Sequence, residues 1–367
     1  MGRVYLLTVL FAAWLAAAVA AQSPPSVVLV TLDGARIEEL FGGLDAGIVK
    51  SQLKEGQRLE DQPIYRRFWA PTADERRAKL MPFFWGTLMR EHGSIAGDPA
   101  HDSRVHLANG HAFSYPGYSE MLVGRAHDDT IKSNDPIRNP YPTVLEFLKA
   151  QAGLSRDQVA VFTSWKVSSA IVEHTESALT VNAGFTAFDS PDQEVRRQSA
   201  LQFETPTPWN DVRHDAYTFR FAMDHLARHR PRVLYLALGE TDDWAHDGRY
   251  DRVLEAFART DEYLKHLWTW LQSQAEYRGR THLLITTDHG RGRTPGDWKS
   301  HGKDVAGASE TWMAFVSPSM SRRGEWSGHP PIVAAQVAAT LVTWMGGDWK
   351  TFDPAAAPPV LPPNLRD

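Results

Sequence analysis

The sequence predicts an α/β fold in which a largely parallel central sheet carries helices on both faces. Short runs rich in Val, Ile and Leu recur along the chain without alternating polar residues, as in strands buried on both faces of a parallel sheet. Segments with helical spacing of apolar residues separate these runs. Acidic and histidine residues follow three of the runs, at the edge where open α/β sheets collect their ligands.

Length and composition describe an ordinary globular protein that can bury a large core. The chain has 367 residues, 43% hydrophobic and 23% charged, and its formal net charge is -5. It contains no long run of Lys and Arg, so no nucleic-acid-binding surface is expected. One large domain over residues 26–346 accounts for most of the chain. The sequence does not indicate an oligomeric state.

The two ends of the chain differ from this domain. Arg3, the apolar run 4–19 and the small residues before Gln22 predict a signal peptide over residues 1–21; the alternative is a retained membrane anchor. We therefore expect a periplasmic or secreted protein with no membrane span after signal removal. The chain has no cysteine, so its fold does not depend on disulfides. Residues 347–367 form a Pro-rich tail, expected to be irregular and partly disordered from Phe352 onward.

In the first third of the chain, the run Ser26–Leu32 predicts a central strand because it is apolar and rich in β-branched residues. Residues 43–78 have no clean period and many charges, which indicates an excursion from the fold. Apolar spacing predicts a helix over Met81–Glu91. A further helix should begin at Ser114, because a Pro two residues later suits a first helical turn.

The middle of the chain alternates helices with strands. Residues 126–136 are polar and indicate a loop over the site. The spacing of apolar residues predicts helices over Thr143–Gln151 and His214–Arg228, and buried apolar runs predict strands over Val159–Thr163 and Val233–Leu238.

The last third continues this pattern. A long helix is expected over Tyr250–Gln274, where leucines and Phe257 recur at helical spacing. The apolar runs His282–Thr287 and Glu310–Val316 predict two more strands, and Pro331–Trp344 predicts a closing helix.

Ser114 is the candidate nucleophile. A serine at a helix N-terminus faces backbone N–H groups that favour an anion such as phosphate or sulfate. The serine hydroxyl is a weak nucleophile at its ordinary pKa and must be activated by a base or a metal.

Candidate metal ligands lie at or just past the predicted strand ends. Each has a simpler explanation alone: Asp33 could cap a helix, and Asp242 with His246 could be a surface pair four residues apart. Three strands that each finish in an acid are hard to explain as three independent caps. The full set is Asp33, Asp242, His246, Asp288, His289 and His301.

The order of these residues along the chain resembles that of the alkaline phosphatase superfamily, nearest to its phosphodiesterase, sulfatase and cofactor-independent mutase branches. The match spans about Val27 to Pro318. The resemblance implies one metal held by Asp242, His246 and His301. It implies a second metal held by Asp33, Ser114, Asp288 and His289. This ligand set suits two zinc ions, with manganese possible because of its oxygen share.

The stretch after Ser114 also resembles the sulfatase signature, in which a Cys or Ser is oxidised to formylglycine. Tyr118 stands where that signature has Arg, so Ser114 is interpreted as an unmodified alcohol. Phosphodiesterases of the superfamily place an Asn after the nucleophile loop to bind a phosphate oxygen, and Asn134 is similar in position if a one-residue gap is allowed.

The resemblance implies a metal-dependent hydrolase of small-molecule phosphoric esters, either a phosphodiesterase or a phosphatase. The alternatives are a phosphoglycerate-mutase-like isomerase, a sulfatase-like hydrolase of sulfuric esters, and a non-catalytic surface protein that keeps a metal for stability. Mutases carry a large inserted lid domain, whereas the chain between Ser114 and Asp242 contains ordinary strand and helix patterns. Hydrolysis is therefore favoured.

Overall fold

The structure is a computed structural model that describes residues 24–321 and 323–360. The predicted signal peptide and the last seven residues of the predicted tail lie outside the described residues. No helix in the described part of the chain is both long and apolar enough to cross a membrane.

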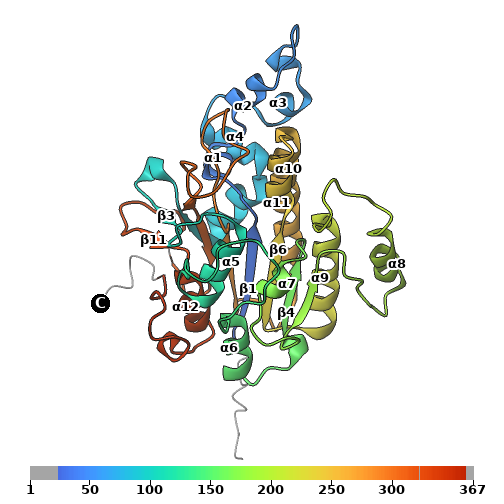
Figure 1. Cartoon of the computed structure of the whole chain (residues 1–367), viewed down its shortest axis with the longest axis vertical. Coiled ribbons are helices and arrows are strands. Elements are labelled where there is room, and N and C mark those ends of the chain that lie inside the picture. Colours follow the sequence, from blue (N-terminus) through green and yellow to red (C-terminus); the bar gives the residue numbers. More distant parts are fainter. Residues whose placement is uncertain (1–23, 322, 361–367) are drawn as a thin grey trace, which may run out of the picture.

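The described chain is organised around an eight-stranded sheet with the order β10-β2-β9-β7-β1-β6-β4-β5 (Figure 1). Strand β9 runs antiparallel to its neighbours β7 and β2, and the other pairs are parallel. The strands are β1 (Ser26–Leu32), β2 (Gly93–Ala96), β4 (Val159–Thr163), β5 (Thr180–Ala183), β6 (Val233–Leu238), β7 (Thr281–Thr286), β9 (Met313–Val316) and β10 (Gly324–Glu325).

A three-stranded sheet with the order β11-β3-β8 lies beside the main one. Its strands are β3 (Val105–His106), β8 (Glu310–Thr311) and β11 (Ile332–Val333).

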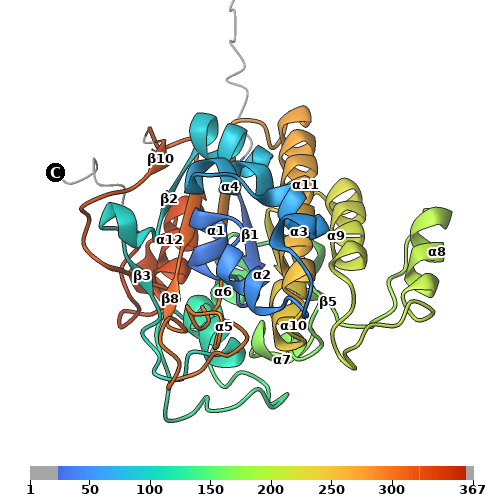
Figure 2. The same cartoon turned by 90° about the horizontal axis from the view of Figure 1, so that it is seen from above.

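Helices cover both faces of the main sheet, so its strands are buried on both sides. The central strand shows this directly, because Val28 and Val30 of β1 face one hydrophobic core whereas Val27 and Leu29 face a second. Helices α1 (Ile37–Gly42), α9 (Asp215–His229) and α11 (Tyr250–Ser273) contribute to the first core, and α5 (Ser114–Val123), α6 (Val144–Gln151) and α12 (Gln336–Trp344) contribute to the second. Figures 1 and 2 show α11 and α12 on opposite sides of β1. The predicted fold class is confirmed.

The described helices vary in length from one turn to more than six. The α-helices are α1 (Ile37–Gly42), α2 (Ala46–Ser51), α3 (Pro63–Phe68), α4 (Ala73–Leu80), α5 (Ser114–Val123), α6 (Val144–Gln151), α7 (Ser168–Ile171), α8 (Gln193–Leu201), α9 (Asp215–His229), α10 (Glu240–His246), α11 (Tyr250–Ser273) and α12 (Gln336–Trp344). A π-helix, η2, spans Phe84–His92, and 3₁₀ turns lie at Leu59–Asp61, Pro99–His101, Arg156–Gln158 and Trp349–Thr351.

Four predicted elements differ from the structure. The helix predicted over Met81–Glu91 is a π-helix, η2, over Phe84–His92. The strand predicted over Glu310–Val316 is wrong as a single element, because β8 pairs with β3 in the small sheet and β9 pairs with β7 and β2. The helix predicted from Pro331 begins only at Gln336, since residues 332–333 form β11. The excursion over 43–78 contains α2, α3 and the start of α4, and the side chains of Asp45 and Thr72 cap α2 and α4.

Candidate metal centre

The sheet brings the predicted ligands together at one edge. Strands β7, β1 and β6 are neighbours, parallel and in close register, so their carboxyl ends lie side by side. Asp33 follows β1 directly, and Asp288 comes two residues after β7. After β6 the chain turns at Gly239 into α10, which carries Asp242 and His246. Three separate segments therefore supply acidic side chains to one place.

We call Asp33, Ser114, Asp288 and His289 the inner group. The Nε2 atom of His289 lies 3.4 Å from Asp33 Oδ1, 3.5 Å from Asp288 Oδ2 and 3.3 Å from Ser114 Oγ. On its other side, His289 Nδ1 donates to the carbonyl of Gly290 at 2.9 Å. That bond fixes the tautomer in which Nε2 presents a lone pair to the other three residues.

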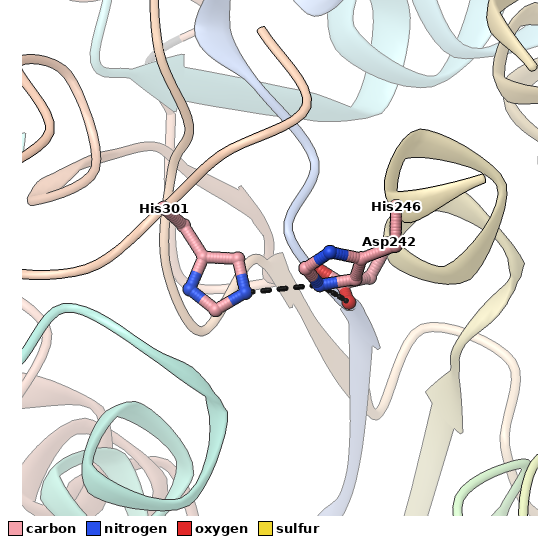
Figure 3. A group of neighbouring side chains, drawn as sticks. All are labelled: Asp242, His246 and His301. Atoms are coloured by element: carbon pink, nitrogen blue, oxygen red, sulfur yellow. Dashed lines mark hydrogen bonds and ion pairs between the residues drawn. The ribbon is translucent and has the colours of Figure 1, made fainter. Parts of the chain in front are cut away.

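We call Asp242, His246 and His301 the outer group (Figure 3). Asp242 and His246 lie four residues apart on α10, with 3.0 Å between Asp242 Oδ2 and His246 Nε2. His301 comes from the loop after β7, and its Nε2 lies 3.0 Å from His246 Nε2. Asp242 also reaches the inner group, because its Oδ1 is 3.6 Å from His289 Nε2.

The protonation states of the two buried histidines favour metal binding, whereas the buried carboxyl groups of Asp33 and Asp288 resist ionisation without a compensating cation. Burial lowers the pKa of His289 to about 4 and that of His301 to about 2, so both imidazoles are neutral near pH 7. Burial, followed by the neighbouring Asp242 charge, raises the pKa of Asp33 well above its ordinary value. Burial and the Asp33 charge do the same to Asp288. Burial alone would also raise the pKa of Asp242, but Arg291 and His246 hold it well below its ordinary value.

Ser114 is the first residue of α5, as the sequence predicts, and it is buried. The expected row of free N–H groups is not there. Tyr115 N–H donates to Asn134 Oδ1 at 2.9 Å, Pro116 has no N–H, and Gly117 N–H donates to Phe113 O at 3.0 Å. In the described part of the chain, this leaves the backbone N–H of Ser114 as the unpartnered donor of the first turn.

Asn134 lies at the same helix end. Its Oδ1 is occupied by Tyr115 N–H, and no described residue bonds its Nδ2. The side chain is exposed, so this amide nitrogen is free to donate to a substrate oxygen. A role for Asn134 in substrate binding stays a prediction, with a geometry that permits it.

Two residues at the centre were not assigned a role there from the sequence. Tyr118 donates its hydroxyl hydrogen to Asp33 Oδ2 at 2.9 Å, which orients that carboxylate. Arg291 is buried and bonds the Asp242 carboxylate. The sequence signal for Arg291 is its position directly after Asp288-His289-Gly290. An arginine in a loop is usually exposed to solvent, so this position alone did not indicate a role at the site.

Another group of potential ligands consists of Asp98, His101 and Glu325. Arg77 donates to both carboxylate oxygens of Glu325 at 2.8 Å, so this acid already has a cationic partner. The group therefore forms an ion-pair network between β10 and the segment after β2.

Comparisons with known proteins agree with the fold. No family model and no curated protein sequence matches the chain. Among solved structures, the alkaline phosphatase PafA has a TM-score of 0.57 at 10% identity, covering 88% of this chain and 96% of that one. The phosphonate monoester hydrolase of Agrobacterium radiobacter has a TM-score of 0.54 at 11% identity, covering 94% and 79% of the two chains.

A sulfatase from Bacteroides thetaiotaomicron, described as putative, has a TM-score of 0.57 at 12% identity and covers 94% of this chain and 75% of its own. The protein is therefore an α/β protein built on a mostly parallel sheet, with carboxylate and imidazole groups clustered at the carboxyl ends of its central strands. The chain shares its fold with these phosphatase, phosphonate monoester hydrolase and sulfatase structures, so the predicted resemblance is confirmed at the level of the fold.

Proposed function

We propose that the protein is a metal-dependent hydrolase of phosphoric esters that acts through Ser114 and two divalent metal ions. The observation that carries this proposal is the position of Ser114 Oγ, 3.3 Å from His289 Nε2 and at the start of a buried helix. A purely structural metal site has no use for a hydroxyl placed there. The predicted export and a periplasmic or secreted location remain part of the proposal.

The side chains fit divalent ions. Asp33 Oδ1, Asp288 Oδ2 and His301 Nδ1 are buried and have no hydrogen-bond partner among the described residues. Buried carboxylate oxygens without a donor are costly unless a cation compensates them. The inner group offers three oxygen ligands and one nitrogen, and the outer group offers two nitrogens and one oxygen. Both sets suit zinc, and the oxygen-rich inner group also suits manganese.

When bound, divalent ions would lower the pKa of the Ser114 hydroxyl and stabilise charge on the leaving oxygen. Ser114 Oγ attacks phosphorus after losing its proton to solvent, and an Oγ–P bond replaces the bond from phosphorus to the leaving oxygen. The leaving oxygen keeps the bonding electron pair and takes a proton from water. A water molecule then attacks the phosphoserine, releasing phosphate or a monoester and restoring Ser114. The Ser114 N–H and Asn134 Nδ2 can donate to the non-bridging oxygens.

Two observations favour phosphoric ester hydrolysis over the alternatives. The chain between Ser114 and Asp242 contributes β4, β5 and β6 to the main sheet, so it contains no large lid domain of the kind that mutases carry. Tyr118 is engaged with Asp33 and stands where the sulfatase signature has Arg. The similar structures named as a phosphatase, a phosphonate monoester hydrolase and a putative sulfatase support ester hydrolysis over isomerisation.

Trapping the covalent intermediate tests the proposal. Rapid acid quenching of the zinc-loaded protein with a ³²P-labelled phosphoester should place the label on the peptide that contains Ser114. Ser114→Ala should lose several orders of magnitude in activity while it keeps most of its metal. Ser119→Ala is the matched control on the same helix: its Oγ accepts from Asn139 at 3.2 Å, so it should affect activity far less.

Three results would contradict the proposal. Label that never appears on the Ser114 peptide would exclude the serine nucleophile. A product that is only an isomer of the substrate would establish a mutase. Faster turnover of p-nitrophenyl sulfate than of p-nitrophenyl phosphate or bis-p-nitrophenyl phosphate would establish a sulfatase.

A further inference from the structure

Arg291 is the buried cation at the centre. Its side chain is inaccessible to solvent although it belongs to the long loop between β7 and β8. Fully buried arginines are rare unless their charge is paired. Here the guanidinium is paired with Asp242, and its Nε has no acceptor among the described residues. The chain therefore accepts an energetic cost to keep this cation beside a potential metal ligand.

The guanidinium bonds two segments that carry the outer group. Through Nη2 it donates to the carboxylate and to the main-chain carbonyl of Asp242, the latter at 3.1 Å, which fixes the start of α10. Through Nη1 it donates to the carbonyl of Lys299, two residues before His301. One side chain thus links the helix that carries Asp242 and His246 to the loop that carries His301.

The surrounding backbone keeps this link in place. On either side of Arg291, Gly290 N–H donates to Ala308 O at 2.8 Å and Gly292 N–H donates to Ser300 O at 2.9 Å. Gly34 leaves the necessary space, because a Cβ there would meet Asp242 Oδ1 and would lie 2.9 Å from Arg291 Nε. The loop, α10 and the end of β1 are therefore shaped around the guanidinium.

We propose that Arg291 is a positioning residue that assembles the outer group in its ligand arrangement before a metal binds. This inference rests on the proposed function, because the side chains that Arg291 positions would hold a catalytic metal. Because Arg291 bonds Asp242 Oδ1, it leaves Oδ2 as the oxygen turned toward His246. Metal binding then requires less ordering of the loop that carries His301, and its entropic cost is lower, as in other preorganised sites.

Hydrogen exchange on the unaltered protein tests this directly. Exchange rates of the peptide that spans residues 290–301 should agree within about threefold between chelator-treated and zinc-loaded protein, because Arg291 rather than the metal orders the loop. Loss of protection on chelation would overturn the proposal, since it would show that the metal holds the loop.

Variants provide the second test. In the metal-free state, Arg291→Met should exchange at least tenfold faster over this peptide. In zinc titrations it should bind one ion with about 10–100-fold lower affinity and the other unchanged. Arg291→Lys should fall between Met and the unaltered protein. Arg293→Met is the matched control, because Arg293 lies on the same loop, is half-exposed and pairs with Glu310.

The outcomes separate the two proposals. If the unaltered protein binds no divalent ion, the proposed function fails. Hydrogen exchange over residues 290–301, compared between metal-free Arg291→Met and Arg293→Met, then still tests whether Arg291 orders the loop. If the unaltered protein binds two ions and Arg291→Met binds both with the same affinities, only the positioning role is overturned.

Discussion

The inner and outer groups are held by the chain in different ways. In the inner group, Asp33 and Asp288 follow strands at the centre of the sheet, and both carboxylates are buried with His289. In the outer group, His246 is half-exposed on a two-turn helix and His301 lies on a loop. Positions next to central strands inherit the rigidity of the sheet, whereas helix and loop positions need side chains such as Arg291 to fix them.

This difference predicts unequal roles for two histidines. His289→Ala removes the residue whose Nε2 lies within 3.6 Å of Asp33, Asp242 and Asp288, so both groups lose a shared neighbour. We expect kcat/KM to fall on the order of 10⁴-fold and the variant to hold less than one metal ion. His301→Ala should lose mainly the outer metal, with a fall of about 10²-fold.

Metal analysis of the dialysed proteins, together with kcat/KM for one phosphodiester, checks this comparison. Circular dichroism controls for unfolding of the buried His289 variant. Equal losses of metal and activity in the two variants would contradict the distinction between an inner group held by the sheet and an outer group held by side-chain contacts.

The sequence was most informative where position along a strand determines position in space. The bounds of β1, β4 and β6 agree with the predicted strands residue for residue, because these runs are apolar on both faces. Asp33 and Asp288 could be placed from strand ends alone. The grouping of His301 with Asp242 and His246 came from the family resemblance, since a loop residue has no periodicity that fixes it.

Edge strands and long-range partners could not be predicted. Strand β5 has four residues and only half of it is buried, so it lacks the apolar run that marks a central strand. The contact between Arg291 and Asp242 joins residues 49 positions apart, and the same residue types would serve equally well on a solvated loop. Likewise, Asn134 ties up a first-turn N–H of α5 through a tertiary contact that helix capping rules do not contain.

A second prediction concerns the start of α10, which supports the outer group. The buried Asp215 accepts from Gly239 N–H at 2.8 Å, Glu240 N–H at 3.2 Å and the Ser164 hydroxyl at 2.5 Å. Burial and the Glu240 charge raise the pKa of Asp215 to about 7 from an ordinary 3.8. The native state then binds the proton more tightly than the unfolded state does, so this contribution to stability is complete below about pH 4 and is lost as the pH rises to about 7.

Urea unfolding at pH 4, 5.5 and 7 measures this effect against Asp215→Asn, which cannot ionise. Relative to the variant, the free energy of unfolding of the unaltered protein should fall by at most about 4 kcal/mol across that range. Parallel pH profiles for the two proteins would show that Asp215 keeps an ordinary pKa.

The last prediction concerns the close approach of helix α5, which carries Ser114, to the inner group. A Cβ on Gly117, three residues after Ser114, would collide with the main-chain carbonyl of Asp288. Neither side can yield easily, because α5 is buried along its length and Asp288 follows a central strand. In Gly117→Ala the helix must therefore move away from Asp288 and carry Ser114 with it.

We expect kcat/KM of Gly117→Ala to fall about 10²-fold, the cost of a misplacement near 1 Å, while metal content is retained. Alanine favours a helix over glycine by about 1 kcal/mol, so a loss of activity here would come from the contact and not from helix propensity. Gly86→Ala in η2 is the control, because a Cβ there meets no described atom within 4 Å. Equal activity in the two variants would show that α5 can move without cost, and that the spacing between Ser114 and the inner group does not limit catalysis.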